Sequence, residues 1–147
     1  MSFLKFLFGG RAAHVTSPAK SGLGSERTWI FRPVDDGAMV DGRPTYEYGV
    51  SHKDDLVMML RCCDAELEVM WRTNLPPAPG YAERAAIIYR RQGDFTKEIE
   101  VCERYLGELD RFLAVSEHAS AARSSVGNTV QKLRDRIARA KVLQAKA

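Results

Sequence analysis

The chain has 147 residues, 45% of them hydrophobic and 28% charged, with a formal net charge of +3 at pH 7. This length and apolar fraction fit one domain with its own core, and no apolar run approaches the length of a membrane span. The small net charge indicates no particular partner, although residues 119–147 carry seven Lys or Arg against one Asp.

The sequence begins with an apolar tip, residues 1–8, and a linker, residues 9–27, that is rich in Gly, Ser, Ala and Thr. The tip has neither a long apolar run nor a clear cleavage site, so no signal peptide is expected. We expect the tip to dock on its own domain or on a neighbouring subunit, and take Phe3, Phe6 and Phe8 as candidate partner-binding residues. Weak membrane-surface binding and a disordered tip are the alternatives.

Strand patterns are confined to residues 28–50. Residues 28–32 and 45–50 show alternating side chains, and the turn dipeptides Asp36-Gly37 and Asp41-Gly42 lie between them. These patterns predict a small antiparallel hairpin and allow a short third strand at residues 38–40. A two-stranded hairpin is marginal alone, so it should lie on helices. The expected packing face consists of Trp29, Phe31, Tyr46 and Tyr48, with a base-stacking platform as the alternative.

The first helix is predicted from Ser51, which fits an N-cap, to about Arg72. Apolar residues recur at helical spacing through this stretch, and Pro76-Pro77 ends the pattern. The expected buried stripe consists of Leu56, Leu60, Cys63, Leu67 and Met70.

Residues 81–113 predict two amphipathic helices that fold back on each other at Gly93-Asp94. The first should span residues 81–92, and the second should start near Thr96. Such a hairpin cannot bury both of its faces alone, so it predicts a packing partner. The expected buried residues are Ala82, Ala85, Ala86 and Tyr89 in the first helix, and Ile99, Cys102, Leu106, Leu109 and Leu113 in the second.

The spacing of Ala86, Tyr89 and Gly93-Asp94-Phe95 resembles that of a tetratricopeptide repeat, in one degenerate copy over residues 81–110. The resemblance implies a helical hairpin used in protein–protein interaction. Glu98 and Tyr105 depart from the family pattern, because they place large groups where helices normally touch, and no second copy follows at the family period. We expect Arg90 and Arg91 on a solvated helix face, with a phosphate contact as the alternative.

Gly127 is predicted to break the chain before a last helix that starts at Asn128. Val130, Leu133, Ile137 and Ala140 then form a short apolar seam, and Leu133 and Ile137 are candidate partner-binding residues. Three interpretations of this helix stay open: packing on the acidic body, binding to a partner or another copy, and contact with nucleic acid or an anionic membrane. The nucleic-acid alternative uses Lys132, Arg134, Arg136, Arg139 and Lys141.

No motif for catalysis, cofactor binding or metal binding emerges from the sequence. His14, His52 and His118 lie far apart, and none stands near a Cys at ligand spacing. Three cysteines without a spacing pattern indicate a reduced protein, which we expect to be cytoplasmic. We therefore expect no catalytic residue, no cofactor and no metal.

Together these patterns predict a mainly α-helical fold of antiparallel helical hairpins with a small N-terminal β-hairpin. The expected organisation is residues 1–27 as tip and linker, residues 28–125 as the helical domain and residues 126–147 as a basic helix. The expected function is that of a non-catalytic protein–protein interaction module: an adaptor, accessory or self-assembling subunit. A nucleic-acid-associated protein is the alternative, and a small enzyme with an unrecognised site is a third.

Overall fold

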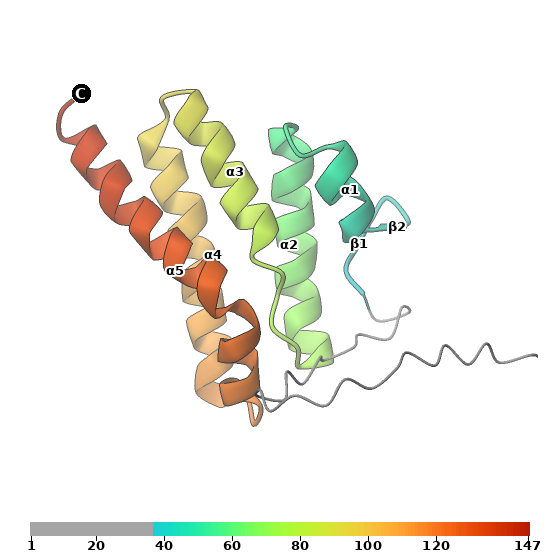
Figure 1. Ribbon diagram of the computed structural model, residues 1–147. Coiled ribbons are helices and arrows are strands. Elements are labelled where there is room, and N and C mark those ends of the chain that lie inside the picture. The colour runs from blue at the N-terminus through green and yellow to red at the C-terminus, as the bar shows by residue number, and fades with distance from the viewer. Residues whose placement is uncertain (1–36) are drawn as a thin grey trace, which may run out of the picture.

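The computed structural model describes residues 37–147 (Figure 1). The predicted strand at residues 28–32 and the tip residues Phe3, Phe6 and Phe8 lie outside the described part. A two-stranded hairpin comes first, and the rest of the described chain is helical. The elements are β1 (Met39–Val40), β2 (Arg43–Pro44), α1 (Thr45–Ser51), α2 (Leu56–Thr73), α3 (Gly80–Arg91), α4 (Phe95–Val115) and α5 (Ala119–Gln144).

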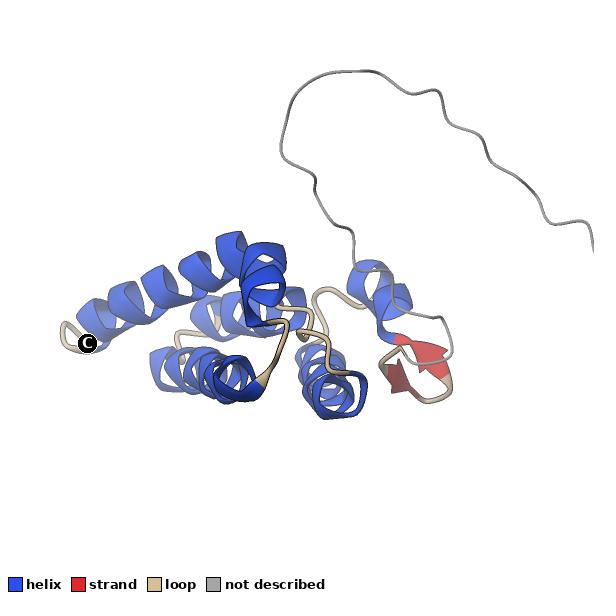
Figure 2. Ribbon diagram, turned by 90° about the horizontal axis from the view of Figure 1, so that it is seen from below, coloured by secondary structure: helices blue, strands red, loops and turns tan. Residues whose placement is uncertain are grey.

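The helices pack as antiparallel neighbours in chain order, from α1 beside the hairpin to α5 at the other end (Figure 1). Seen from below, they form two layers, with α1, α3 and α5 in one and α2 and α4 in the other (Figure 2). Contacts between α2 and α4, and between α3 and α5, connect members of the same layer. The predicted fold class, mainly α with antiparallel hairpins and a small β-hairpin, is confirmed.

The β-hairpin is shorter than predicted: its first strand lies within the short strand that the sequence allows at residues 38–40, and its second strand, Arg43–Pro44, is not predicted. Met39 pairs with Pro44 and Val40 with Arg43, around the predicted turn at Asp41-Gly42. Both turn residues have positive φ, 49° and 74°, as a type I′ turn requires. The strand expected at residues 45–50 is wrong, because these residues form α1.

Two buried side-chain contacts account for the helical form of residues 45–51. Thr45 and Tyr48, three residues apart, share the buried face of α1. The Thr45 hydroxyl donates to Glu66 Oε1 on α2 at 2.7 Å, and the Tyr48 hydroxyl donates to the Val40 carbonyl oxygen at 3.1 Å. Because six residues are too few for periodicity to decide between strand and helix, these tertiary contacts override the strand propensity of the segment.

The long helix α2 starts later than predicted. Its N-cap is Asp55, whose carboxylate accepts a hydrogen bond from the Met58 amide at 3.0 Å. Ser51 ends α1 instead, and its hydroxyl donates to the Glu47 carbonyl oxygen at 2.8 Å. The helix stops at Asn74, which adopts the left-handed conformation typical of a helix C-terminus.

The predicted helical hairpin is confirmed as α3 and α4, with the reversal at Gly93-Asp94. Gly93 has a φ of 75°, which favours glycine, and the Asp94 amide donates to the Tyr89 carbonyl oxygen at 3.0 Å. The Asp94 carboxylate then caps α4 by accepting from the Lys97 amide at 3.0 Å. Ala82, Ala85 and Ala86 are fully buried, so small side chains let the neighbouring helices approach α3.

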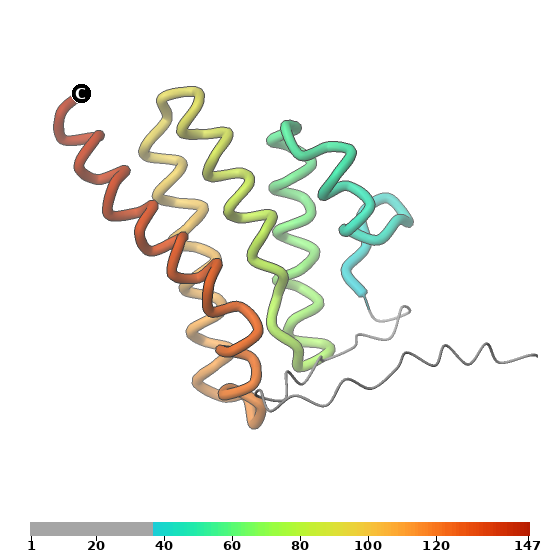
Figure 3. The backbone as a smooth tube through the Cα atoms, in the orientation of Figure 1, coloured from blue at the N-terminus to red at the C-terminus, as the bar shows by residue number. Residues whose placement is uncertain are grey.

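The last helix, α5, runs without interruption from Ala119 to Gln144. The predicted break at Gly127 and helix start at Asn128 are therefore wrong, and the boundary expected between residues 125 and 126 falls within one helix. The first turns of α5 bend relative to the rest (Figure 3). Ser124 and Ser125 donate to the carbonyl oxygens of Ser120 and Ala122, at 3.2 and 2.8 Å, and such back-bonding favours a bend.

One continuous core lies between the helices and extends from Val40 in the hairpin to Leu133 in α5. Tyr105 is fully buried within it, and its hydroxyl donates to the Pro77 carbonyl oxygen at 2.7 Å. The large residue that departs from the tetratricopeptide pattern is thus accommodated by a bond to the loop between α2 and α3.

Candidate functional site

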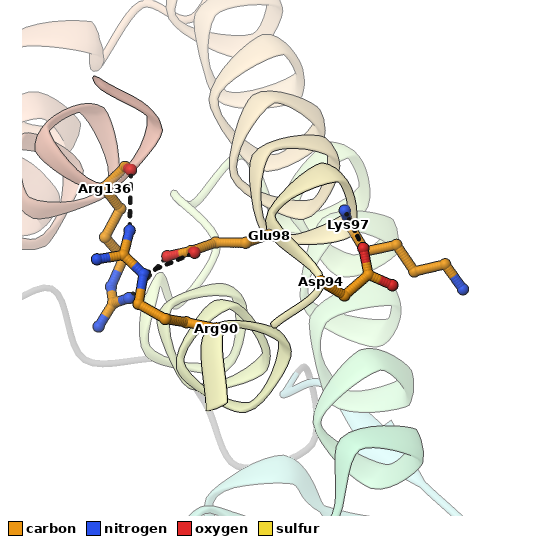
Figure 4. A network of polar contacts seen from close by, with 5 residues as sticks. All are labelled: Arg90, Asp94, Lys97, Glu98 and Arg136. Carbon is orange, nitrogen blue, oxygen red and sulfur yellow. Dashed lines mark hydrogen bonds and ion pairs between the residues drawn. The ribbon is translucent and has the colours of Figure 1, made fainter. Parts of the chain in front are cut away.

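A fully buried carboxylate, that of Glu98, lies where α3, α4 and α5 meet (Figure 4). Arg90 Nε on α3 donates to Glu98 Oε2 at 2.7 Å, and Arg136 Nη1 on α5 donates to Glu98 Oε1 at 2.9 Å. Arg90 Nη2 also donates to the Arg136 carbonyl oxygen at 3.3 Å. We call these three residues the Glu98 clamp.

The Glu98 clamp explains how the chain tolerates a carboxylate at a helix contact. A buried charge is very costly unless it is paired and hydrogen-bonded, and here each carboxylate oxygen receives its own guanidinium. The prediction that Arg90 lies on a solvated helix face is therefore wrong. Arg90 forms part of the interface between the helices. Because both oxygens of the buried carboxylate are paired, and no buried side-chain polar atom of the described residues lacks a hydrogen bond, the geometry indicates a structural joint.

The outer surface of α3 carries a second set of arginines. Arg84 and Arg91 both donate to Asp54 Oδ1, at 2.9 and 3.0 Å, and Arg84 Nε donates to the Lys53 carbonyl oxygen at 2.7 Å. Desolvation raises the pKa of Asp54, but the Arg91 hydrogen bond and the neighbouring positive charges outweigh it, so the pKa is lowered. Arg91 is exposed, as predicted, yet it also holds the loop between α1 and α2 on α3.

The three cysteines are free and buried. Burial is the largest cause that raises the pKa of Cys62 to about 11 and those of Cys63 and Cys102 to about 12. At neutral pH the thiols are therefore protonated, which opposes a role as nucleophile. Within residues 37–147, no group of three or more His, Cys, Asp or Glu side chains is placed to hold a metal ion.

The two partner-binding candidates of the last helix lie on its inner face. Leu133 is fully buried, and Ile137 is partly buried against the same core. The seam that the sequence indicated is therefore covered by this chain's own helices, α4 above all. Neither residue forms an open surface in the described structure.

The five candidate nucleic-acid cations of α5 are divided between two sides of the helix. Residues two positions apart point in different directions, whereas residues seven apart share a side. Lys132, Arg136 and Arg139 thus lie on one side, and Arg134 and Lys141 on the other. Arg136 is held in the Glu98 clamp, and Lys141 Nζ pairs with Glu103 Oε1 on α4 at 3.0 Å. Lys132, Arg134 and Arg139 are exposed.

An exposed apolar pair, Tyr46 and Val50, occupies the outer face of α1. The two residues are one helical turn apart, and 68% and 82% of their surfaces are accessible. The strand prediction placed Tyr46 and Tyr48 together in a packing face. In the helix α1, Tyr48 is buried and Tyr46 is not. The Pro44 that precedes the segment fits a helix start, and it was the available signal for α1.

A shallow depression of about 300 Å³ lies between the hairpin and α2. Met39, Val40 and Ala65 supply its apolar lining, and its charged lining is Asp41, Arg61, Asp64 and Glu68. Arg61 is joined to Asp41 by two hydrogen bonds, so the hairpin is fixed on α2 at this point. The Arg61 hydrogen bond also lowers the pKa of Asp41.

Comparison with family models, curated proteins and solved structures gave no match to this chain. Within residues 37–147, no helix has both the length and the apolar character needed to cross a membrane.

Proposed function

We propose that the protein is a non-catalytic protein–protein interaction module, an adaptor or self-assembling subunit, that binds through the outer face of α1. The observation that supports this most directly is the exposed pair Tyr46 and Val50. Exposed apolar side chains that adjoin each other can contribute to a contact site, whereas single exposed apolar residues are normal on a protein surface.

The contrast between the two ends of the helical array supports the same proposal. At the far end, the outward residues of α5 include Lys132, Asp135 and Arg139, which are exposed and polar, and its large exposed apolar residues, Val142 and Leu143, are confined to the last turn. A polar outer face is what the terminal element of a stacked helical array needs. At the near end, α1 presents an aromatic and a β-branched side chain instead. That end is therefore the one suited to receive another protein surface.

The proposal is tested by changing the exposed pair in the full chain. The double variant Tyr46→Ser, Val50→Ser should weaken self-association, or release a bound partner, as measured by light scattering coupled to size-exclusion chromatography. Val115→Ser is the matched control, since Val115 is 72% exposed at the end of α4. A second variant, with Phe3, Phe6 and Phe8 changed to Ser, tests whether the apolar tip contributes.

A wild-type chain that is monomeric at all concentrations and retains no other protein would contradict this function. If Val115→Ser weakens association as much as the double variant does, any exposed apolar residue contributes to association. The outer face of α1 would then not be the binding site. Circular dichroism verifies that each variant is folded.

A further inference from the structure

We propose that the depression between β1 and α2 is the docking site of the chain's own residues 27–32, Arg-Thr-Trp-Ile-Phe-Arg. This site is separate from the outer face of α1 and does not depend on the function proposed for Tyr46 and Val50. The proposal rests on the position of the depression in the chain, on its apolar lining and on its charge.

The described chain begins at the edge of the depression. Gly37 precedes Met39, which lines the depression and is 47% exposed. Phe31 is six residues before Gly37, and an extended chain spans at most about 3.6 Å per residue, so Phe31 lies within roughly 22 Å of Gly37. A segment tethered at so short a distance has an effective concentration in the millimolar range, which favours it over any free competitor.

The lining matches the side chains of this segment. Exposed Met39 and partly buried Ala65 offer apolar surface to Trp29 or Phe31, whereas Val40, which also lines the depression, is itself buried. Beyond the depression, the exposed face of α2 continues to Val57 in one direction and Trp71 in the other, both at least half exposed. With Arg61, Asp64 and Glu68, these residues recur at steps of four and three, so they share one side of the helix.

The charges of the two surfaces are opposite. The depression carries three carboxylates and one guanidinium, and Arg61 and Asp41 already neutralise each other. Asp64 pairs with Arg104 at 2.7 Å, whereas Glu68 forms no ion pair within residues 37–147. Residues 27–32 carry Arg27 and Arg32 and no acid, whereas the acids Glu26, Asp35 and Asp36 flank this segment. An arginine from this segment would therefore give Glu68 a counterion.

The test uses Trp29 as a reporter in the full chain. The sequence has two tryptophans, so Trp71→Phe leaves Trp29 as the single emitter. Quenching by acrylamide, which is uncharged, measures how accessible its indole is. We expect Trp29 to be quenched less in the folded protein than in urea. The variant Glu68→Arg should abolish this protection, and Met39→Asp should reduce it. Glu100→Arg, which makes the same charge change on the exposed surface of α4, should leave protection intact.

Three outcomes would overturn the proposal. The first is a Trp29 that is quenched equally in the folded and the unfolded chain. The second is protection that survives both Glu68→Arg and Met39→Asp, which would place the segment on another surface. The third is protection that disappears on dilution, which would show that the segment docks on a second copy. Circular dichroism distinguishes unfolding of the variants from release of the segment. Glu68 is exposed, so its replacement leaves the core intact.

Discussion

At the scale of single residues, the Glu98 carboxylate on α4 joins this helix to α3 and α5 through its two ion pairs. Glu98→Gln keeps the shape of the side chain but leaves the partly buried guanidinium groups of Arg90 and Arg136 without their carboxylate partner. Breaking a buried ion pair from one side typically costs about 3–5 kcal/mol. We therefore expect Glu98→Gln to lower the free energy of unfolding by about that amount, as measured by urea denaturation.

The matched control for Glu98→Gln is Glu103→Gln on the same helix. Glu103 also pairs with a cation of α5, Lys141, but both side chains are more than half exposed. Solvent screens such a pair, and its loss should cost no more than about 1 kcal/mol. If the two variants cost the same, burial of Glu98 adds nothing, and the Glu98 clamp is not the joint we describe.

The buried thiols give a prediction of pH dependence. The pKa of each thiol is higher in the folded chain, about 11 or 12, than in the unfolded chain, where it is about 8.5. Unfolded chains therefore lose these protons first, and stability falls as pH rises from about 8.5 towards 11. The slope should reach about 1.4 kcal/mol per pH unit for each thiol. Urea denaturation at a series of pH values measures it.

A variant with Cys62, Cys63 and Cys102 changed to Ala separates the thiols from lysine and tyrosine, which also titrate at alkaline pH. Its stability should depend less steeply on pH over the same range. Alkylation by iodoacetamide at pH 8 should be slow in the folded chain and fast in urea, because the thiolate is the reactive form. An unchanged pH slope in the triple variant would refute the assignment.

At the scale of elements, side-chain N-caps mark where α2 and α4 begin. Asp55→Ala removes the side chain that accepts from the Met58 amide, and loss of an N-cap typically costs about 1 kcal/mol. Ser51→Ala removes the hydrogen bonds of the Ser51 hydroxyl with the Glu47 carbonyl oxygen and with His52 Nδ1 at the end of α1, but no N-cap. Urea denaturation should therefore show a larger loss for Asp55→Ala. The reverse order would mean that the helix starts at Ser51, as its sequence pattern suggests.

A long periodic element beside a clear turn signal is easier to predict from the sequence than a short element that is held by tertiary contacts. The reversal at Gly93-Asp94 was predicted because two long periodic segments flank a glycine that needs positive φ. Residues 45–50 were assigned the wrong structure because Thr45 and Tyr48 are held by Glu66 and Val40, contacts that no local pattern contains. Likewise, the spacing of Leu133 and Ile137 revealed an apolar face but not that α4 would cover it. The exposed pair Tyr46 and Val50 is not predicted either, because it lies on one face only when the segment is a helix.

At the scale of the whole molecule, two basic residues at the end of the chain already pair with acidic residues of α4. The ion pairs of Arg136 with Glu98 and of Lys141 with Glu103 join α5 to α4, so two of the five candidate cations contribute to the fold. This arrangement corresponds to the first of the three interpretations of the basic helix, packing on the body. The cations that remain exposed are distributed over two sides of α5.

This distribution limits how α5 could bind a polyanion. The affinity of a protein for duplex DNA falls with log salt at a slope of about −0.9 for each phosphate that it neutralises. If α5 binds with one side, Lys132 and Arg139 contribute and the slope from this helix is about −2. Arg139→Glu should then halve it, whereas Lys141→Gln should leave it unchanged. Titration of a labelled duplex at several salt concentrations measures both.

A slope near −5 would require all five cations to reach phosphates. Arg136 would then have to leave Glu98, and α5 would have to detach from α4.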